Sequence, residues 1–142
     1  MDELASERLR DAAGRAFAGT PVLFAYLFGS AATGRSRPDS DLDIAVYLEP
    51  RIDAGCYLDL SLDLAGRLSE ASRLGNVDLL ILNEAPLPIL GRVVQERVVL
   101  YSRDEPARVH FESRSLREFF DFEIHARPLD RKFLRDIAEG RR

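Results

Sequence analysis

The stretch LFGSAATGRSRPDSDLDIAVYL, residues 27–48, decides the fold of this chain. Residues 22–28 are an almost unbroken apolar run, which is typical of a strand covered on both faces. Gly29 and Ser30 end that run, and the next four residues have room only for a short turn of helix. Residues 41–48 then alternate, because Leu42, Ile44, Val46 and Leu48 share one side. The stretch therefore predicts two strands joined by a helical turn and a loop.

The polar residues at the two strand ends have the character of a phosphate and metal site. A glycine directly after a buried strand lets the backbone approach a ligand closely, and Ser30 opens a helical turn whose free N–H groups and hydroxyl can hold a phosphate. Asp41 and Asp43 leave the same face of the second strand, with their Cα atoms about 6.6 Å apart. Carboxylates at that spacing can converge on divalent ions, and oxygen ligands favour Mg²⁺ or Mn²⁺ over zinc.

A third carboxylate, Asp78, begins the otherwise apolar run of residues 77–82. Burying it without a partner would cost several kcal/mol or raise its pKa. We therefore expect Asp78 to face a cation, to have a catalytic task, or to sit at an exposed strand end. Sharing a metal with Asp41 and Asp43 and activating an attacking hydroxyl would be its natural task.

The rest of the chain alternates helical and strand patterns. Residues 57–74 fit two templates, because their leucines alternate like a strand but also follow a helical period; length and the absence of β-branched residues favour a helix. We expect the other helices at 2–18, 86–94 and beyond 104, and the other strands at 77–82 and 97–101. The fold class is therefore mixed α/β (α+β), a small mixed sheet flanked by helices, with a core at 1–103 and a helical C-terminal extension at 104–142.

Composition excludes several classes of protein. The 142 residues suffice for one domain and hold one cysteine and two histidines, so we expect neither an internal disulfide nor a Cys/His zinc cluster. The net charge of −4 argues against a dedicated nucleic-acid binder. No apolar run is long enough to span a bilayer, and the N-terminus lacks a signal-peptide pattern, so we expect a cytoplasmic protein.

Gly29-Ser30, ten residues, then Asp41-x-Asp43, together with Asp78, resembles the nucleotidyltransferase superfamily that includes DNA polymerase β and kanamycin nucleotidyltransferase. Small size and the quoted stretch are most similar to the minimal nucleotidyltransferase (MNT) antitoxins that are paired with HEPN toxins. The resemblance covers residues 22–82 well; from about residue 104 only helical character and length agree. It implies Mg²⁺-dependent transfer of AMP from ATP to a tyrosine of the cognate HEPN RNase, which silences that toxin.

The resemblance also implies a role for each matching position. Gly29 and Ser30 would bind the β- and γ-phosphates of ATP, and Asp41 and Asp43 would hold two Mg²⁺ ions. Asp78 would be the third carboxylate, ligating one metal and assisting deprotonation of the acceptor hydroxyl. No position of the core motif departs from the pattern.

Weaker signals flank this motif. Arg35 and Arg37 lie in the loop before the aspartates, where either could neutralise triphosphate oxygens, although a solvated arginine fits as well. Asp39, directly after a proline, is better explained as a turn residue than as a ligand. Tyr47 shares the face of Asp43 and could pack on a base or on a helix. In the C-terminal helix, the spacing predicts that Phe119, Phe120, Leu116 and Ile124 lie in the core, whereas Phe122 lies off that stripe and faces a partner or the domain itself.

Two other functions compete with protein adenylylation. One is nucleotidyl transfer to a small molecule of the aminoglycoside type, for which this short chain leaves little room for a substrate domain. The other is a non-enzymatic antitoxin that neutralises a toxin by covering it, against which the three aspartates count. For the leading hypothesis we expect a heteromeric complex with the toxin, ATP as substrate, and no direct contact with a membrane or with nucleic acid.

Overall fold

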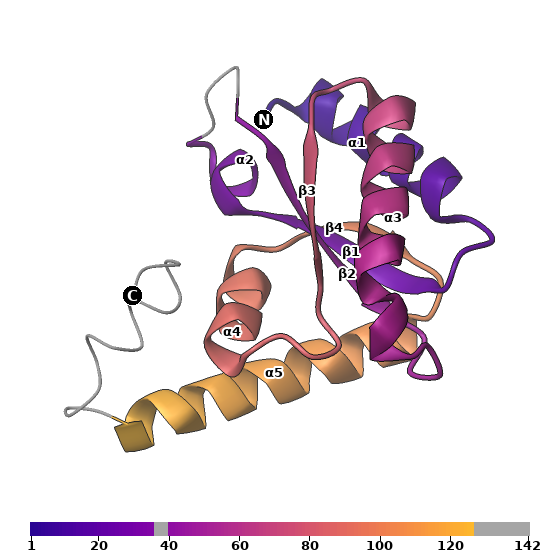
Figure 1. Cartoon of the computed structure of the whole chain (residues 1–142). Coiled ribbons are helices and arrows are strands. Elements are labelled where there is room, and N and C mark those ends of the chain that lie inside the picture. Colours follow the sequence, from indigo (N-terminus) through magenta and orange to yellow (C-terminus); the bar gives the residue numbers. More distant parts are fainter. Residues whose placement is uncertain (36–39, 127–142) are drawn as a thin grey trace.

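The computed structural model describes residues 1–35 and 40–126. Its centre is a four-stranded sheet in the order β3-β2-β1-β4 (Figure 1). β1 pairs antiparallel with both β2 and β4, and β2 pairs parallel with β3. The strands are β1 (Val22–Phe28), β2 (Leu42–Leu48), β3 (Val77–Ile81) and β4 (Val98–Ser102). The mixed sheet confirms the predicted fold class.

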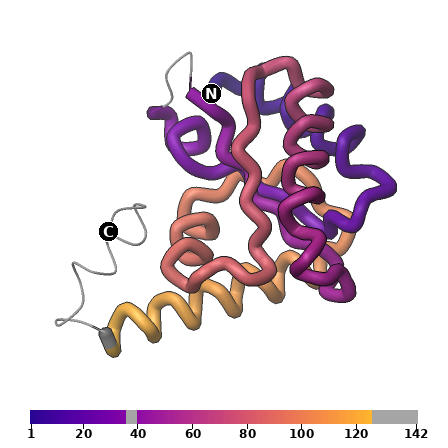
Figure 2. Tube along the Cα trace, in the orientation of Figure 1, coloured from indigo at the N-terminus to yellow at the C-terminus, as the bar shows by residue number. Residues whose placement is uncertain are grey.

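Helices cover both faces of this sheet (Figure 1). On one face lie α1 (Glu3–Phe17) and α3 (Tyr57–Ser72), which also pack against each other. On the other lie α4 (Leu87–Glu96) and α5 (Glu105–Ala126). The short α2 (Gly29–Thr33) follows β1 directly, and a 3₁₀ turn, η1 (Ala54–Cys56), precedes α3. The N-terminal ammonium donates to the carbonyl of Ala31 at 3.4 Å, so the start of the chain lies beside α2 (Figure 2).

Successive side chains of β2 point to opposite faces of the sheet, so this strand contributes to both hydrophobic cores. Ile44 and Val46 lie in the core that α1 and α3 close, whereas Ala45 lies in the core that α4 and α5 close. β1 is buried along nearly its whole length, as its continuous apolar run predicts. Polar side chains at the ends of these two strands are therefore carried by the deeply buried centre of the sheet.

The segment at residues 57–74, whose sequence fits both a strand and a helix, forms a helix, α3. Leu64 and Leu68 are fully buried at helical spacing, while Leu58 and Leu62 are 71% and 66% exposed. The alternation of leucines that resembled a strand therefore reflects two sides of one helix, an inner and an outer one.

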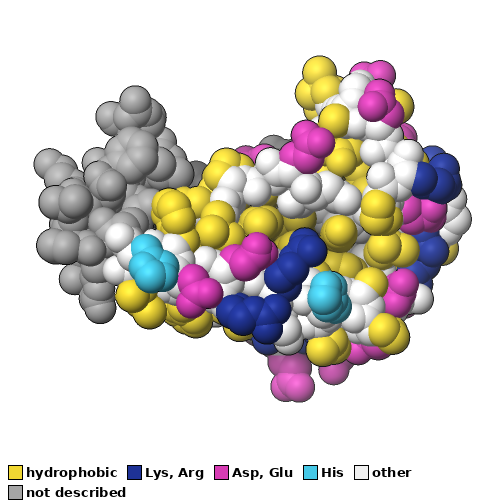
Figure 3. Space-filling view, turned by 90° about the horizontal axis from the view of Figure 1, so that it is seen from below, with side chains coloured by type: hydrophobic (Ala, Val, Ile, Leu, Met, Phe, Trp, Pro, Cys, Tyr) yellow, Lys and Arg dark blue, Asp and Glu magenta, His cyan; other side chains and the backbone are white. Residues whose placement is uncertain are grey.

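The prediction for the end of α5 is partly wrong. Phe120 and Ile124 were expected in the core, but they are 44% and 60% exposed. The last turns of α5 extend past the sheet (Figure 1), so only the side of the helix that faces α4 finds cover there. Phe119 takes that side and packs against Gly91. Hydrophobic side chains are exposed on the face seen from below in Figure 3, and Phe122, at 41% exposed, belongs to the surface as well.

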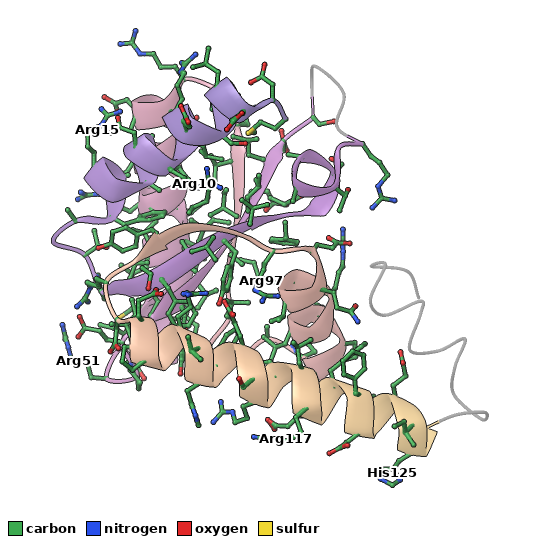
Figure 4. All side chains as sticks on the ribbon, turned by 180° about the vertical axis from the view of Figure 1, so that it is seen from behind. Arg10, Arg15, Arg51, Arg97, Arg117 and His125 are labelled. Atoms are coloured by element: carbon green, nitrogen blue, oxygen red, sulfur yellow. The ribbon has the colours of Figure 1, made fainter. Side chains whose placement is uncertain are left out.

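A polar cluster ties α5 to the sheet. Tyr26, fully buried on β1, donates its hydroxyl to Glu112 Oε2 at 2.8 Å. The same carboxylate accepts a hydrogen bond from Arg108 Nη1 at 2.7 Å and lies 3.3 Å from Arg97 Nε. Arg97 lies between the sheet and α5 in Figure 4. Burial, with the adjacent carboxylate, raises the pKa of Tyr26. Two arginines thus compensate the one buried carboxylate of this region.

Among the helices of the described residues, none is long and apolar enough to cross a membrane.

Candidate active site

The turn at the end of β1 requires a glycine. Gly29 is buried and has a backbone φ of +75°, a region that other residues adopt only with strain. A Cβ at this position would overlap Oδ2 of Asp43 and would lie 3.0 Å from its Cγ. The Gly29 backbone and the Asp43 side chain therefore pack directly against each other. Asp43 can take this position only because residue 29 has no side chain.

Sheet register brings two of the three predicted carboxylates side by side. Asp43 of β2 pairs with Asp78 of the parallel strand β3, and on its other side it pairs with Phe28 of β1. Directly paired residues project from the same face of a sheet, and neighbouring strands lie about 4.8 Å apart. Asp41 lies one residue before the start of β2. Asp43 is half-buried, whereas Asp41 and Asp78 are exposed, so Asp78 meets the expectation of an exposed strand end.

Electrostatics show that these groups influence one another. Partial burial raises the pKa of Asp43, and the charge of Asp78 raises it further. The Arg92 guanidinium opposes this rise, whereas the carboxylates of Asp41 and Glu96 add to it. Burial and the neighbouring carboxylates thus disfavour the ionised form of Asp43, and an added cation would relieve the repulsion.

Comparison with known families decides the class of protein. The family model for "Polymerase beta, Nucleotidyltransferase" matches residues 16–106, more than half of the 142 residues. The chain belongs to this family. The matched region contains the whole sheet, the Gly29 turn and all three carboxylates. No curated protein sequence matches the chain at a significant level.

Solved structures share the fold of this nucleotidyltransferase. A toxin–antitoxin structure with AMP-PNP matches with a TM-score of 0.65 and 22% identity over 82% of this chain and 91% of the other. The structure of the tri-AMPylated HEPN toxin of Shewanella oneidensis in complex with MNT antitoxin matches with a TM-score of 0.60 and 21% identity, over 89% and 92% of the two chains. A toxin–antitoxin MntA–HepT structure matches with the same TM-score and identity, over 88% and 92%. Since the agreement covers most of both chains, the fold extends beyond the family match to include α5.

The donor set of this nucleotidyltransferase fits Mg²⁺ that arrives with a phosphate ligand. Within residues 1–35 and 40–126, no three acidic, histidine or cysteine side chains are already gathered as a metal cluster. Mg²⁺ is usually bound by one or two carboxylates together with substrate phosphates rather than by an all-protein cage. The carboxylates around the half-buried Asp43 repel one another and do not form a closed cage, as expected for Mg²⁺ that is bound partly by substrate phosphates. Asp41, Asp43 and Asp78 could each supply one carboxylate.

The arginine predicted near the phosphates, Arg35, lies two residues beyond the end of α2. Its backbone N–H donates to the carbonyl of Ser30 at 2.8 Å, and its Nε donates to Thr33 Oγ1 at 3.0 Å. Its side chain is exposed next to the turn, so it remains a candidate for contact with a ligand. Arg37 and Asp39 lie outside the described residues. Tyr47 stacks on Phe24 of β1 at 5.0 Å between ring centroids and lies 5.3 Å from the ring of Phe111 on α5, which favours packing against the helix over contact with a base.

Sequence reasoning missed two residues of α4 that reach this turn. Glu96 Oε1 accepts the backbone N–H of Gly29 at 3.0 Å, and Arg92 Nε lies 3.4 Å from the same oxygen. The predicted helix ended at residue 94, so Glu96 fell outside it. The i, i+4 spacing of Arg92 and Glu96 was visible in the sequence, but 67 positions separate Glu96 from Gly29 and no local pattern indicates such a contact.

Proposed function

We propose that this chain is a protein adenylyltransferase that acts as an antitoxin: it transfers AMP from ATP to a tyrosine of a HEPN RNase toxin, with Mg²⁺ as cofactor. The observation that carries the proposal is the placement of Asp43 between the Gly29 turn and Asp78. A phosphate-binding turn and paired carboxylates at one end of a rigid sheet are the parts that nucleotidyl transfer needs.

Each residue of the motif has a task in this proposal. Gly29 and Ser30 bind the β- and γ-phosphates of ATP: Ser30 donates its backbone N–H and hydroxyl, while Gly29, whose own N–H is donated to Glu96, lets the phosphates approach the backbone closely. Arg35 can add a charge-assisted bond to the phosphates. Asp41 and Asp43 hold Mg²⁺, with Asp78 as third ligand. When bound, Mg²⁺ supplies positive charge that stabilises the attacking and leaving oxygens.

The reaction is an in-line substitution at the α-phosphorus of ATP. The tyrosine oxygen forms a bond to that phosphorus, and the bond from phosphorus to the bridging oxygen of pyrophosphate breaks. Asp78, exposed at the start of β3, accepts the phenolic proton and releases it to solvent. The products are O-adenylylated tyrosine and pyrophosphate.

The choice of a protein acceptor rests on two observations. Similar chains come from toxin–antitoxin structures, one of which contains a tri-AMPylated HEPN toxin. Asp41 and Asp78 are also exposed in the structure, so a bulky acceptor can approach them from outside.

Intact-mass spectrometry tests the proposal. A cognate HEPN-type protein is incubated with this chain, ATP and Mg²⁺, and a mass gain of one or more AMP units is expected. Asp41→Asn should abolish the gain. Asp63→Asn is the matched control, because Asp63 is an exposed aspartate that pairs with Arg67 on α3, away from the turn; it should leave transfer unchanged.

The possible outcomes separate the competing functions. A stable complex without any mass gain, and protection of cells by a triple Asp→Ala variant, would favour a non-enzymatic antitoxin. Nucleotidylated aminoglycoside formed without a protein partner would favour a small-molecule transferase.

A further inference from the structure

The carboxylate of Glu96 fixes the backbone of the Gly29 turn. The Gly29 N–H donates to Glu96 Oε1 at 3.0 Å, and the Cβ-free face of Gly29 packs on Asp43. The side chain of Glu96 is only 20% exposed. A hydrogen bond from a backbone N–H to a carboxylate is stronger than a neutral one. The turn is thus held from two sides, by α4 and by β2.

Arg92, one turn earlier on α4, joins this arrangement. Its Nε lies 3.4 Å from Glu96 Oε1, and its Cζ lies over the ring of Phe28 at 5.7 Å from the centroid. Phe28 is the residue directly before Gly29, so the guanidinium lies beside the turn. Its side chain is 40% exposed, twice the fraction of Glu96. Glu96 is therefore the more enclosed of the two, with its carboxylate on the Gly29 backbone, and Arg92 stays partly accessible to a ligand beside the turn.

Charge balance gives Arg92 a particular importance. The carboxylates of Asp43, its paired neighbour Asp78 and Glu96 lie around the Gly29 turn, and the guanidinium of Arg92 lies beside the same turn. Cations bound by the aspartates would offset the carboxylates but would still leave the phosphate tail of a nucleotide in a negative environment. A guanidinium matches phosphate oxygens in a bidentate geometry that a metal ion does not replace.

We propose that Arg92 is a phosphate-binding residue of the nucleotide site, and that Glu96 is a positioning residue that holds both Arg92 and the Gly29 turn in place. The proposal rests on the proposed function, since it assumes that a nucleoside triphosphate binds at this turn. It adds α4 to the site, which otherwise consists of β1, α2, β2 and β3.

The first test compares binding of AMP-PNP and adenosine by isothermal titration calorimetry in Mg²⁺. Arg92→Gln should weaken AMP-PNP binding roughly tenfold to a hundredfold, the size expected for hydrogen bonds to a charged group, and should leave adenosine binding unchanged. Arg114→Gln is the matched control, because Arg114 forms an i, i+4 pair with Glu118 on α5 at 3.6 Å with the same order of charges. It should change neither affinity.

The second test separates positioning by Glu96 from a general effect on stability. Glu96→Gln keeps an oxygen acceptor for the Gly29 N–H, whereas Glu96→Ala removes it. We expect the alanine variant to weaken AMP-PNP binding at least fivefold and to shift the Gly29 amide resonance in a ¹⁵N-correlated NMR spectrum. The glutamine variant should restore most of the affinity and most of the wild-type amide shift. If both variants bind AMP-PNP like the wild type, Glu96 has no positioning role.

Failure of this inference differs from failure of the proposed function. If wild-type protein does not bind AMP-PNP, the nucleotide site itself is refuted. If the wild type binds and Arg92→Gln binds equally well, or loses adenosine affinity to the same degree, the phosphate role of Arg92 is refuted and the proposed function stands.

Discussion

Replacing Gly29 by alanine tests the central packing of the site. The backbone φ of +75° costs a residue with a side chain about 1–2 kcal/mol. The new methyl group would also overlap the Asp43 carboxylate, and over-packing of this kind costs about 1–3 kcal/mol more. We therefore expect Gly29→Ala to lower the free energy of unfolding by about 2–5 kcal/mol. Because Asp43 must move to relieve the overlap, AMP transfer should fall by about two orders of magnitude, as expected for a misplacement of about 1 Å.

Gly19 provides the matched control for this substitution. Its φ is +77°, nearly that of Gly29, but nothing lies within 4 Å of a Cβ built there. Gly19→Ala should therefore lose only the conformational part, about 1–2 kcal/mol, and should keep full activity. Urea denaturation of both variants and of the wild type gives the difference. Equal losses of stability in the two variants, with transfer intact in both, would refute the argument that Gly29 and Asp43 are packed against each other.

Three further predictions concern the helices and the charge of the site. Gly91→Ala should destabilise the protein by about 1–3 kcal/mol in urea unfolding, because its Cβ would overlap the aromatic ring that α5 packs there; Gly66→Ala, at an open helical position, should instead stabilise it by about 0.5–1 kcal/mol. Tyr26→Phe should cost about 1–3 kcal/mol, since it removes a donor from the buried carboxylate of Glu112, and differential scanning calorimetry should show a lower Tm. Asp43→Asn should be more stable than the wild type at neutral pH without Mg²⁺, since the pKa of Asp43 is raised in the folded state, so its ionisation weakens folding as the pH rises. This advantage should vanish as the pH falls below 3.8, the ordinary pKa of an aspartate. Thermal unfolding in EDTA at several pH values checks this, and a wild type as stable as the variant at every pH would contradict the raised pKa.

Local patterns predicted the parts of the fold that local physics determines. The strand over residues 22–28 and the glycine turn after it follow from a continuous apolar run and its sudden end. The partnership of Asp43 and Asp78 needed one more step, because two strands with a carboxylate near the start of each come together only if they pair in parallel. That pairing requires a crossover between the strands, and α3 supplies it, so the choice of helix for that segment supported the site as well as the fold.

The errors lie where tertiary placement overrides a pattern. Phe120 and Ile124 have helical spacing, yet they are exposed because α5 extends past the sheet that would have covered them. The sequence did not indicate Glu96 as a residue of the site, because the hydrogen-bond partner of its carboxylate is a backbone N–H on another element. Periodicity reports which side of a helix is apolar, but not how far the neighbouring sheet reaches or which main-chain donor a carboxylate will meet.

The repulsion around Asp43 couples stability to cation binding. The apolar cores on both faces of the sheet are closed without any side chain of the site, so the fold can tolerate a carboxylate whose ionised form is disfavoured. A cation that binds the folded chain stabilises it by about 2.7 kcal/mol when its concentration is a hundred times the dissociation constant. Asp43→Asn removes the repulsion and the ligand together, so its Tm should rise in EDTA and then respond little to Mg²⁺ added together with AMP-PNP. An equal rise of Tm with Mg²⁺ and AMP-PNP in wild type and Asp43→Asn would place the ion elsewhere on the molecule and would refute the assignment of Asp43 as a ligand.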